Sequence, residues 1–343
     1  MTLPKISYSK LDLLKKCPYR YKKKYIEKKF VKTDSVATEF GSIVHKGLEL
    51  KGQYIMNGQD IDYDEIHSVL LSGFEEKTDK GHEKLLGVQE LRRKYFEEWY
   101  KKDETTNQSV EDRFKTYIYE VLPNRMEDIE WNVYGTEVPF EFVYDNRCII
   151  IGFIDRVDMK YGIVEKENYE NSKIEETENS LRGAFHGIPI EAFRIVDYKS
   201  SKKVFRQEEI KTPLQMVVYD LACLFMYGIV PQYHEYDFVG LNQKQAQING
   251  VCSNGYLKRG VKKINSLLDQ IDEMAKTNDY APGPSPLCHW CEYCATNQNA
   301  LDDFKNLCPY FSLWTPENKT FQVNQKYISG VIPEKQEKRK FIF

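Results

Sequence analysis

Two short segments, GFIDRVD at residues 152–158 and IVDYK at residues 195–199, constrain the fold of this chain most. Each is an apolar run that ends in a carboxylate, Asp155 in the first and Asp197 in the second. Because side chains alternate between the two faces of a strand, Lys199 shares a face with Asp197. Acids from two adjacent strands, with that lysine and the backbone carbonyl of Tyr198, can hold a divalent cation and a water beside a phosphate. The segments therefore predict a sheet with a site for metal-assisted phosphodiester hydrolysis.

The pattern of apolar residues divides the chain into a helical part and a following part rich in strands. Residues 6–30 predict a helix with Ser7 or Ser9 as its N-cap, and residues 38–130 predict a highly charged helical subdomain. Strand patterns follow at 131–144, 148–157, 193–198 and 233–241, with helical patterns at 213–227 and 261–276. Residues 160–190 are acidic and polar, which predicts an exposed insertion between the second and third strands. We expect an α/β chain with four parts: an N-terminal helix (1–37), the helical subdomain (38–130), a core (131–280) and a cysteine-rich tail (281–343).

Composition and charge place few limits on the partner. The 343 residues are 41% hydrophobic and carry a formal net charge of −3, which gives no global sign of a polyanionic partner. Basic residues nevertheless gather with tyrosines at residues 15–29, where a local patch can bind phosphates; a solvated helix face is the alternative. The first residues lack the apolar centre of a signal peptide, and no apolar run is long enough to span a bilayer. We therefore expect a cytoplasmic protein without membrane association.

Two further motifs could contribute to the same site. The string GSIVH ends at His45, and Gln215 and Tyr219 form Q-x3-Y at the start of the helix after the third strand. His45 could complete a metal shell with a neutral imidazole nitrogen, and a buried hydrogen-bonding histidine is the alternative. The i, i+4 spacing places Gln215 and Tyr219 on one helical face, where they could hold DNA or the lysine, or serve packing alone.

In their order along the chain, these motifs resemble the RecB-like branch of the PD-(D/E)xK nucleases. The order is CPYRY at residues 17–21, G-x3-H, G-x2-D, D-x-K, Q-x3-Y and then clustered cysteines, and it covers about residues 6–50 and 131–310. The resemblance implies a restriction-endonuclease-like central mixed sheet flanked by helices, and a deoxyribonuclease that depends on Mg²⁺ or Mn²⁺. Asp158 falls outside the family position, so we expect it to be a neighbour or a salt-bridge residue. The implied active site consists of His45, Asp155, Asp197 and Lys199, with Gln215 and Tyr219 as a helper motif.

The chain has eight cysteines, which in an intracellular protein argue for metal binding or buried thiols rather than disulfides. Cys148, Cys223 and Cys252 stand in apolar settings, so we expect them in the core. Family members related to AddB and to the CRISPR-adaptation nucleases bind a 4Fe–4S cluster with one N-terminal and three C-terminal cysteines. The remaining cysteines of this chain lie near its two ends, as that arrangement requires.

The resemblance assigns Cys17, Cys288 and Cys291 to such a cluster. The usual position of the last ligand, six residues after Cys291, holds an asparagine here. We favour Cys308, because a proline follows it as one often follows the last ligand, and we keep Cys294 as the alternate. Two other interpretations stay open. The four C-terminal cysteines could bind zinc by themselves, or the cysteines could bind no metal.

The leading functional hypothesis is an exonuclease that acts on DNA ends or single strands in recombination, repair or phage replication. It would work in the cytoplasm of a bacterium or of a phage-infected host, where a helicase or recombination protein could be its partner. The alternative is a non-catalytic DNA-end-binding or scaffold protein that retains the fold. Such a protein would be expected to have lost an acid or the lysine, and this chain has kept them. An unrelated metal-binding interaction protein is the third hypothesis.

Overall fold

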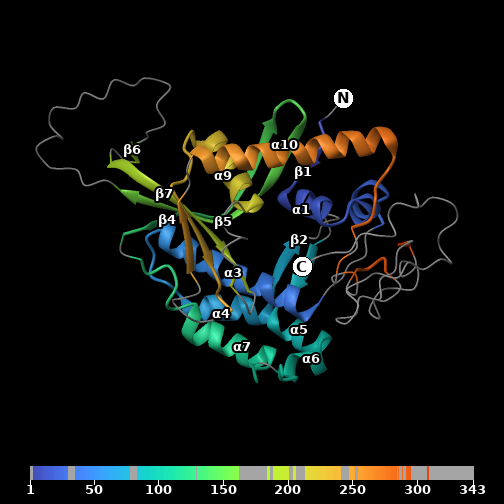
Figure 1. Ribbon diagram of the computed structural model, residues 1–343. Helices are drawn as coiled ribbons and strands as arrows, with labels where there is room; N and C mark the ends of the chain where they lie inside the picture. Colours follow the sequence, from blue (N-terminus) through green and yellow to red (C-terminus); the bar gives the residue numbers. More distant parts are fainter. Residues whose placement is uncertain are drawn as a thin grey trace, which may run out of the picture. The chain divides into compact units, whose positions relative to one another are not determined.

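The chain folds as two compact units, which Figure 1 shows as a ribbon. We call residues 1–6 and 34–262 the sheet unit, and residues 7–33 and 263–343 the cysteine unit. The structure is a computed structural model, and each unit is described by itself. It describes residues 3–29, 35–77, 83–104, 106–128, 130–161, 184–185, 188–200, 204–205, 213–240, 247–251, 254–283, 285, 288, 291–294 and 307–308.

A mixed sheet forms the centre of the sheet unit, with seven strands in the described residues. Its order is β1-β5-β7-β8-β9, with β4 paired to β5 and β6 paired to β7. β5 runs antiparallel to both β4 and β7, whereas β7 and β8 run parallel. A parallel pair needs a crossover connection, and α9 (Leu214–Tyr227) lies in the connection between β7 and β8. The strands are β1 (Lys5–Ile6), β4 (Asn132–Tyr144), β5 (Cys148–Tyr161), β6 (Ala184–Phe185), β7 (Ile188–Tyr198), β8 (Tyr233–Asp237) and β9 (Gln247–Val251).

The expected central mixed sheet with flanking helices is confirmed, although several strand boundaries differ. β5 continues beyond the predicted end at residue 157. Arg156 and Asp158 are charged and buried there, and they remain in the strand because they form an ion pair with each other. β1 and β9 were not predicted, since a two-residue strand and a short polar strand carry little periodicity. Residues 162–183 and 186–187 of the predicted insertion lie outside the described residues.

Helices cover the sheet on two sides within this unit. In Figure 1, α9 lies above the sheet, and α3 (Val36–Met56), α4 (Tyr63–Ser72) and α7 (Val110–Thr116) lie below it. Val196 and Tyr198 of β7 share a buried apolar cluster with side chains of these lower helices, such as Phe40 and Leu48 of α3. The lower layer also contains α5 (Val88–Lys94), α6 (Phe96–Tyr100) and a π-helical turn, η2 (Tyr117–Val121).

A β-hairpin interrupts the region that was predicted as helical throughout. β2 (Phe74–Lys77) and β3 (Glu83–Leu86) pair antiparallel directly after α4. Gly73 ends α4 with a φ of 119°, a conformation that side chains rarely adopt. The glycine thus turns the chain out of the helix and into the hairpin.

The cysteine unit begins with two short helices in place of the single predicted one. Of the two predicted N-caps, Ser7 is the one that caps α1 (Tyr8–Lys16), and its hydroxyl accepts a hydrogen bond from the amide of Lys10. Cys17 is extended and separates α1 from α2 (Pro18–Tyr21), because a proline disfavours the helical conformation of the preceding residue. A π-helical turn, η1 (Lys22–Ile26), follows α2. α10 (Asn254–Thr277) crosses the division between the units and starts seven residues before its predicted start at 261.

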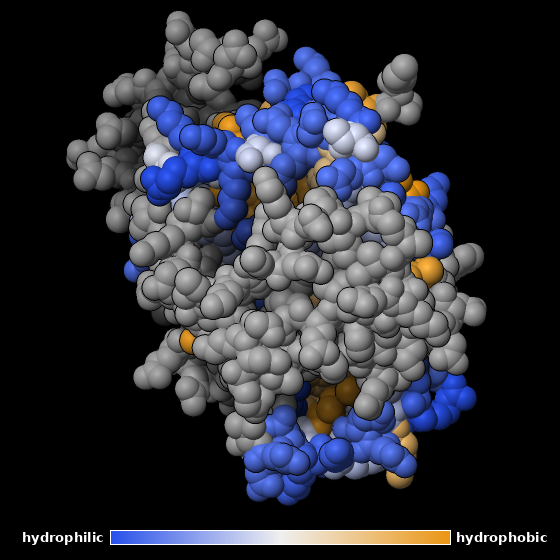
Figure 2. Space-filling view, turned by 45° about the vertical axis from the view of Figure 1, so that its right-hand side comes forward, coloured by the Kyte–Doolittle hydropathy of each residue, from blue (hydrophilic) through white to orange (hydrophobic). Residues whose placement is uncertain are grey.

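One face of the molecule shows mainly hydrophilic side chains among the described residues. Figure 2 shows one face of the molecule, on which the coloured side chains are mostly blue and the apolar ones are scattered. Among the described helices, none combines the length and the apolar character that crossing a bilayer requires.

Candidate active site

The pairing of β5 with β7 brings the two predicted acids together. Arg156 of β5 lies opposite Val196 of β7, so Asp155 and Asp197 flank the same residue pair. The amide of Tyr198 donates a hydrogen bond to Oδ2 of Asp155 over 2.7 Å. The arrangement that the sequence predicted for these strands, with one acid on each, is therefore present.

Lys199 and Gln215 hold Asp197 from two sides. Nζ of Lys199 forms an ion pair with Oδ2 of Asp197, and it also donates to Oε1 of Gln215 over 3.1 Å. The amide nitrogen of Gln215 donates to Oδ1 of Asp197 over 2.7 Å and to the hydroxyl of Tyr219 over 2.9 Å. Both helper residues thus point from the first turns of α9 toward the D-x-K motif, as their shared helical face allows.

His45 lies beside Asp155 together with an acid that the sequence analysis missed, Glu137. Nδ1 of His45 is 3.7 Å from Oε1 of Glu137 and 3.7 Å from Oδ2 of Asp155. One ligand atom from each of these three residues lies within 4.8 Å of the other two. A single glutamate in an alternating strand gives no distinctive signal in the sequence, and only its position across from Asp155 makes it notable.

Burial and crowding of like charges shift the protonation of these groups. Burial raises the pKa of Asp197 to about 7, and the nearby carboxylate of Asp155 acts in the same direction. Burial also raises the pKa of Asp155, against the effect of His45. Burial would lower the pKa of His45, but the carboxylates of Asp155 and Glu137 outweigh it and raise the pKa to about 9. A bound cation would stabilise the ionised carboxylates, so this donor set fits a divalent metal ion.

Asp158 is a structural residue, as its position outside the motif predicted. Its Oδ2 accepts hydrogen bonds from Arg194 over 2.7 Å and from Arg156 over 3.0 Å, and all three residues are buried. Arg156 also donates to the hydroxyl of Tyr198 over 2.9 Å. Arg156 thus contacts Asp158 and Tyr198, as expected for side chains that share a face of the sheet, whereas the adjacent Asp155 points to the other face.

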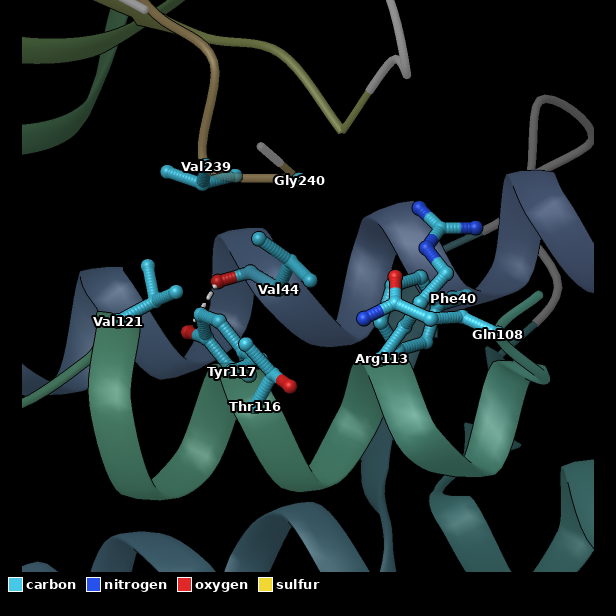
Figure 3. Close-up of a pocket in the computed structure, with 9 residues that line it drawn as sticks. All are labelled: Phe40, Val44, Gln108, Arg113, Thr116, Tyr117, Val121, Val239 and Gly240. Carbon is cyan, nitrogen blue, oxygen red and sulfur yellow. Dashed lines mark hydrogen bonds between the residues drawn. The ribbon is translucent and has the colours of Figure 1, made fainter. Parts of the chain in front are cut away.

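The lower helical layer contacts the loop that follows Lys199. Nη2 of Arg113 in α7 donates to the carbonyl of Ser200 over 3.1 Å. Arg113 also lines a cavity of about 60 Å³ (Figure 3), in which the hydroxyl of Tyr117 donates to the carbonyl of Val44 over 2.7 Å. Arg113 thus joins the lining of this cavity to the chain that follows the D-x-K motif.

A model of the PD-(D/E)XK nuclease superfamily matches residues 5–168 and 188–296, which is most of the chain. The chain belongs to this superfamily. A search of curated proteins gave no match. Membership in the PD-(D/E)XK superfamily implies a metal-dependent nuclease, and the matched segments contain His45, Glu137, Asp155, Asp197, Lys199, Gln215 and Tyr219.

Outside this acidic site, the superfamily match extends through three of the C-terminal cysteines but ends before Cys308. Cys148 and Cys223 are buried in the sheet unit, as expected for core residues, whereas Cys252 lies outside the described residues. All the predicted cluster ligands belong to the cysteine unit: Cys17, Cys288, Cys291, Cys294 and Cys308. The part of the chain that the structure describes contains no disulfide between them.

Backbone amides point at the sulfur atoms of two of these cysteines. Sγ of Cys17 accepts from the amides of Arg20 and Gly283, each over 3.4 Å, and Sγ of Cys288 accepts from the amide of Ser285 over 3.3 Å. The bond from Arg20 caps the N-terminus of α2, for which Cys17 is the N-cap.

Proposed function

We propose that this chain is a deoxyribonuclease of the RecB-like branch that uses Mg²⁺ or Mn²⁺ to cleave DNA at free ends or in single strands. Recombination, repair and phage replication are the processes that we propose for it, in the cytoplasm and with a helicase or recombination protein as partner. The observation that carries the proposal is the joint contact of Lys199 and Gln215 with Asp197, next to Asp155. Without a role in binding a cation, the burial of these charged groups would cost free energy of folding.

Each residue of the site has a role that follows from its contacts. His45, Asp155, Asp197 and the carbonyl of Tyr198 would hold the cation. The bound metal ion supplies electrostatic stabilisation to the reacting phosphate and lowers the pKa of a bound water. Lys199 is fixed by Asp197 and Gln215, so its ammonium can orient the attacking water or neutralise charge that develops on the phosphate oxygens.

Gln215 and Tyr219 act through Asp197 and Lys199 as positioning residues. The side-chain amide of Gln215 has a donor for Asp197 and an acceptor for Lys199, so it holds both ends of the D-x-K motif at once. Tyr219 accepts the second hydrogen of that amide and fixes its orientation. This arrangement lets a buried carboxylate and an ammonium keep one geometry when DNA is absent.

We further propose that Cys17, Cys288, Cys291 and Cys308 bind a 4Fe–4S cluster, with Cys294 as the alternate last ligand and zinc as the alternative metal. All of these cysteines belong to the cysteine unit, which is compatible with one shared metal centre. Thiolates are the usual protein ligands of iron–sulfur clusters, and four thiolates also bind zinc well.

A basic and aromatic surface of the cysteine unit could contact the phosphates and bases of a strand. Nζ of Lys10 lies 5.2 Å from the ring centre of Tyr25, and Nζ of Lys24 lies 5.6 Å from the same ring. Nζ of Lys22 lies 5.1 Å from the ring centre of Tyr280. The lysines supply charge for the phosphates, and the ring of Tyr25, which is partly exposed, could stack on a base, whereas Tyr280 is buried.

The nuclease proposal is tested with protein purified without oxygen. End-labelled single- and double-stranded DNA is incubated with Mg²⁺ or Mn²⁺ and the wild type, Lys199→Ala or Asp197→Ala. We expect cleavage by the wild type and a loss of at least 100-fold in both variants. If the wild type binds DNA ends but cleaves nothing, the non-catalytic alternative is correct.

A further inference from the structure

We propose that Asp220 and His234 form a buried positioning pair for the active site, which fixes the orientation of α9 and, through it, the position of Gln215. Nε2 of His234 in β8 lies 2.6 Å from Oδ1 of Asp220 in α9. The side chain of Asp220 is 0% exposed and that of His234 is 6% exposed. Neither residue has a role in the proposed metal binding or hydrolysis. The inference rests on the proposed nuclease function, because it assigns the pair a role in the same reaction.

The first argument is the chemical character of α9. Asp220 is the only charged residue of this helix, and the buried side chains around it are nearly all apolar. A buried ion pair is often no more stabilising than well-packed apolar side chains of similar volume. Apolar contacts have no preferred direction, however, whereas a hydrogen bond holds only over a narrow range of distances and angles. The pair therefore defines the orientation of α9 more than it adds to the free energy of folding.

The second argument is that α9 makes directional contacts with two neighbouring strands. Gln215 donates to Asp197 of β7 over 2.7 Å, and Asp220 contacts His234 of β8. In the parallel pairing of these strands, His234 lies opposite Ile195, two residues before Asp197 on the same face. Gln215 and Asp220 are five residues apart, so they project from the helix in directions about 140° apart. Two bonds in different directions fix both the rotation of α9 about its axis and its position along that axis.

The third argument is a tyrosine that contacts both the pair and the start of α9. The ring of Tyr256, in the part of α10 that belongs to the sheet unit, lies 5.5 Å from the ring of His234 between their centres. Its hydroxyl donates to the carbonyl of Pro213 over 3.5 Å. Pro213 is the N-cap residue of α9, two residues before Gln215. The histidine and the first turn of the helix are thus held by the same side chain.

Loss of the pair should therefore affect the reaction more than the fold. If α9 rotates by a small angle, the amide of Gln215 no longer meets Asp197 and Lys199 together. A misplacement of about 1 Å can slow an enzyme roughly 100-fold, even when its cause lies far from the reacting atoms. The affinity for DNA should not change, because the pair is buried.

The experiment compares the wild type with the double variant Asp220→Ala/His234→Phe in the full-length protein. The double variant keeps the summed side-chain volume nearly constant and leaves neither polar partner buried alone. Single-turnover cleavage of end-labelled DNA at saturating metal should be roughly tenfold slower than in the wild type. The Kd for DNA, measured by fluorescence anisotropy without metal, should stay within about twofold of the wild-type value.

Two comparisons separate positioning from a purely structural role. In the Gln215→Met background, the double variant should slow cleavage by less than a further factor of about two, because the pair acts through Gln215. Val218→Ala truncates a buried apolar side chain of the same helix and serves as the control. It should lower the midpoint of urea denaturation but cleave DNA within about twofold of the wild-type rate.

A second pair of variants gives the same test if the double variant does not fold. The side-chain nitrogen of glutamine takes the place of Nε2 of histidine, whereas that of asparagine takes the place of Nδ1. His234→Gln should therefore keep the hydrogen bond to Asp220 and most of the cleavage rate. His234→Asn should lose both. Equal rates in these two variants would contradict the role of the pair.

The outcomes also distinguish the two proposals. If the folded double variant cleaves DNA within about twofold of the wild-type rate, the pair serves packing alone. If its tenfold loss persists in the Gln215→Met background, the pair acts by a route other than Gln215. Either result overturns the inference and leaves the nuclease proposal intact. Wild-type protein that cleaves no DNA would instead overturn the proposed function.

Discussion

The side-chain amide of Gln215 donates to Oδ1 of Asp197 over 2.7 Å, and this bond joins α9 to the strand that carries the D-x-K motif. Gln215 is the only one of the two helper residues with a hydrogen bond to Asp197 in the described structure. The position of this buried carboxylate thus depends on a helix that begins seventeen residues after it in the chain.

Gln215→Met should lower the rate of DNA cleavage by roughly 10- to 100-fold, because residues that orient metal ligands typically contribute that much. Methionine has a similar volume but cannot donate to Asp197 or accept from Lys199. The rate is measured under single-turnover conditions with saturating metal. Gln53→Met, at an exposed position of α3, serves as the control and should cleave at the wild-type rate. A Gln215→Met rate within twofold of wild type would contradict the positioning role.

Asp155 and Asp158 lie three positions apart, but their substitution should have different effects on the free energy of unfolding. Asp158→Ala leaves the buried guanidiniums of Arg156 and Arg194 without their shared partner, so the free energy of unfolding should fall by about 3 kcal/mol or more. Asp155→Asn relieves repulsion with Glu137 and should leave the metal-free protein at least as stable as wild type. Urea denaturation measures both, with Asp60→Ala at an exposed loop position as the control. Equal destabilisation by the two changes would refute this division of roles.

Arg113→Met removes the hydrogen bond to the carbonyl of Ser200 and the contact of the guanidinium with the ring of Phe40, at 4.9 Å from its centre. We expect the free energy of unfolding to fall by about 1–2 kcal/mol. The cleavage rate should fall severalfold, because the chain after Lys199 loses a support. The matched control is Arg93→Met, whose guanidinium pairs with Glu90 on the surface and whose loss should change neither quantity. If Arg113→Met matches the wild type in both its melting curve and its cleavage rate, Arg113 does not support the chain after Lys199.

The stability of the protein should rise between pH 8 and pH 10 because of Lys51. Its ammonium is fully buried and donates to the carbonyls of Leu122 and Pro123. Burial lowers the pKa of Lys51 to about 8 from its usual 10.5. The cost of burying the charge is present in full below pH 8. It disappears as the folded protein releases the proton while the unfolded chain still holds it.

This prediction is checked by comparing the wild type with Lys51→Met. The free energy of unfolding of the wild type, relative to that of the variant, should increase by about 1–3 kcal/mol between pH 7.5 and pH 10. Lys115→Met, which changes an exposed lysine of α7, should show no such trend. A difference that is flat across this range would mean that Lys51 keeps an ordinary pKa.

Substitution of single cysteines should separate the cluster ligands from the core thiols. Cys17→Ser should lose most of the iron, the sulfide and the visible absorbance of protein purified without oxygen, because a 4Fe–4S cluster needs all its thiolates. Cys148→Ser, in the core of the sheet unit, should retain them. Comparison of Cys308→Ser with Cys294→Ser identifies the last ligand. Zinc without iron in fresh wild-type protein would refute the cluster.

The sequence alone determined the elements that depend on neighbouring residues. Ser7 was recognised as one of two candidate N-caps, Pro213 to Tyr227 as a helix, and the runs before Asp155 and Asp197 as strands, because capping and periodicity are local properties. The order of the motifs was sufficient to indicate the superfamily. Asp158 was expected to be a neighbour or a salt-bridge residue because it falls outside the family position, and it forms salt bridges with Arg156 and Arg194.

Only the tertiary structure decided which charged side chains meet. Asp158 pairs with both Arg156 and Arg194, and Glu137 lies across from Asp155. Both facts follow from strand register, which joins residues far apart in the chain and leaves no mark in local periodicity. A one-residue shift of β4 would turn Glu137 away from the site. Its place beside His45 and Asp155 therefore becomes visible only once the strands are paired.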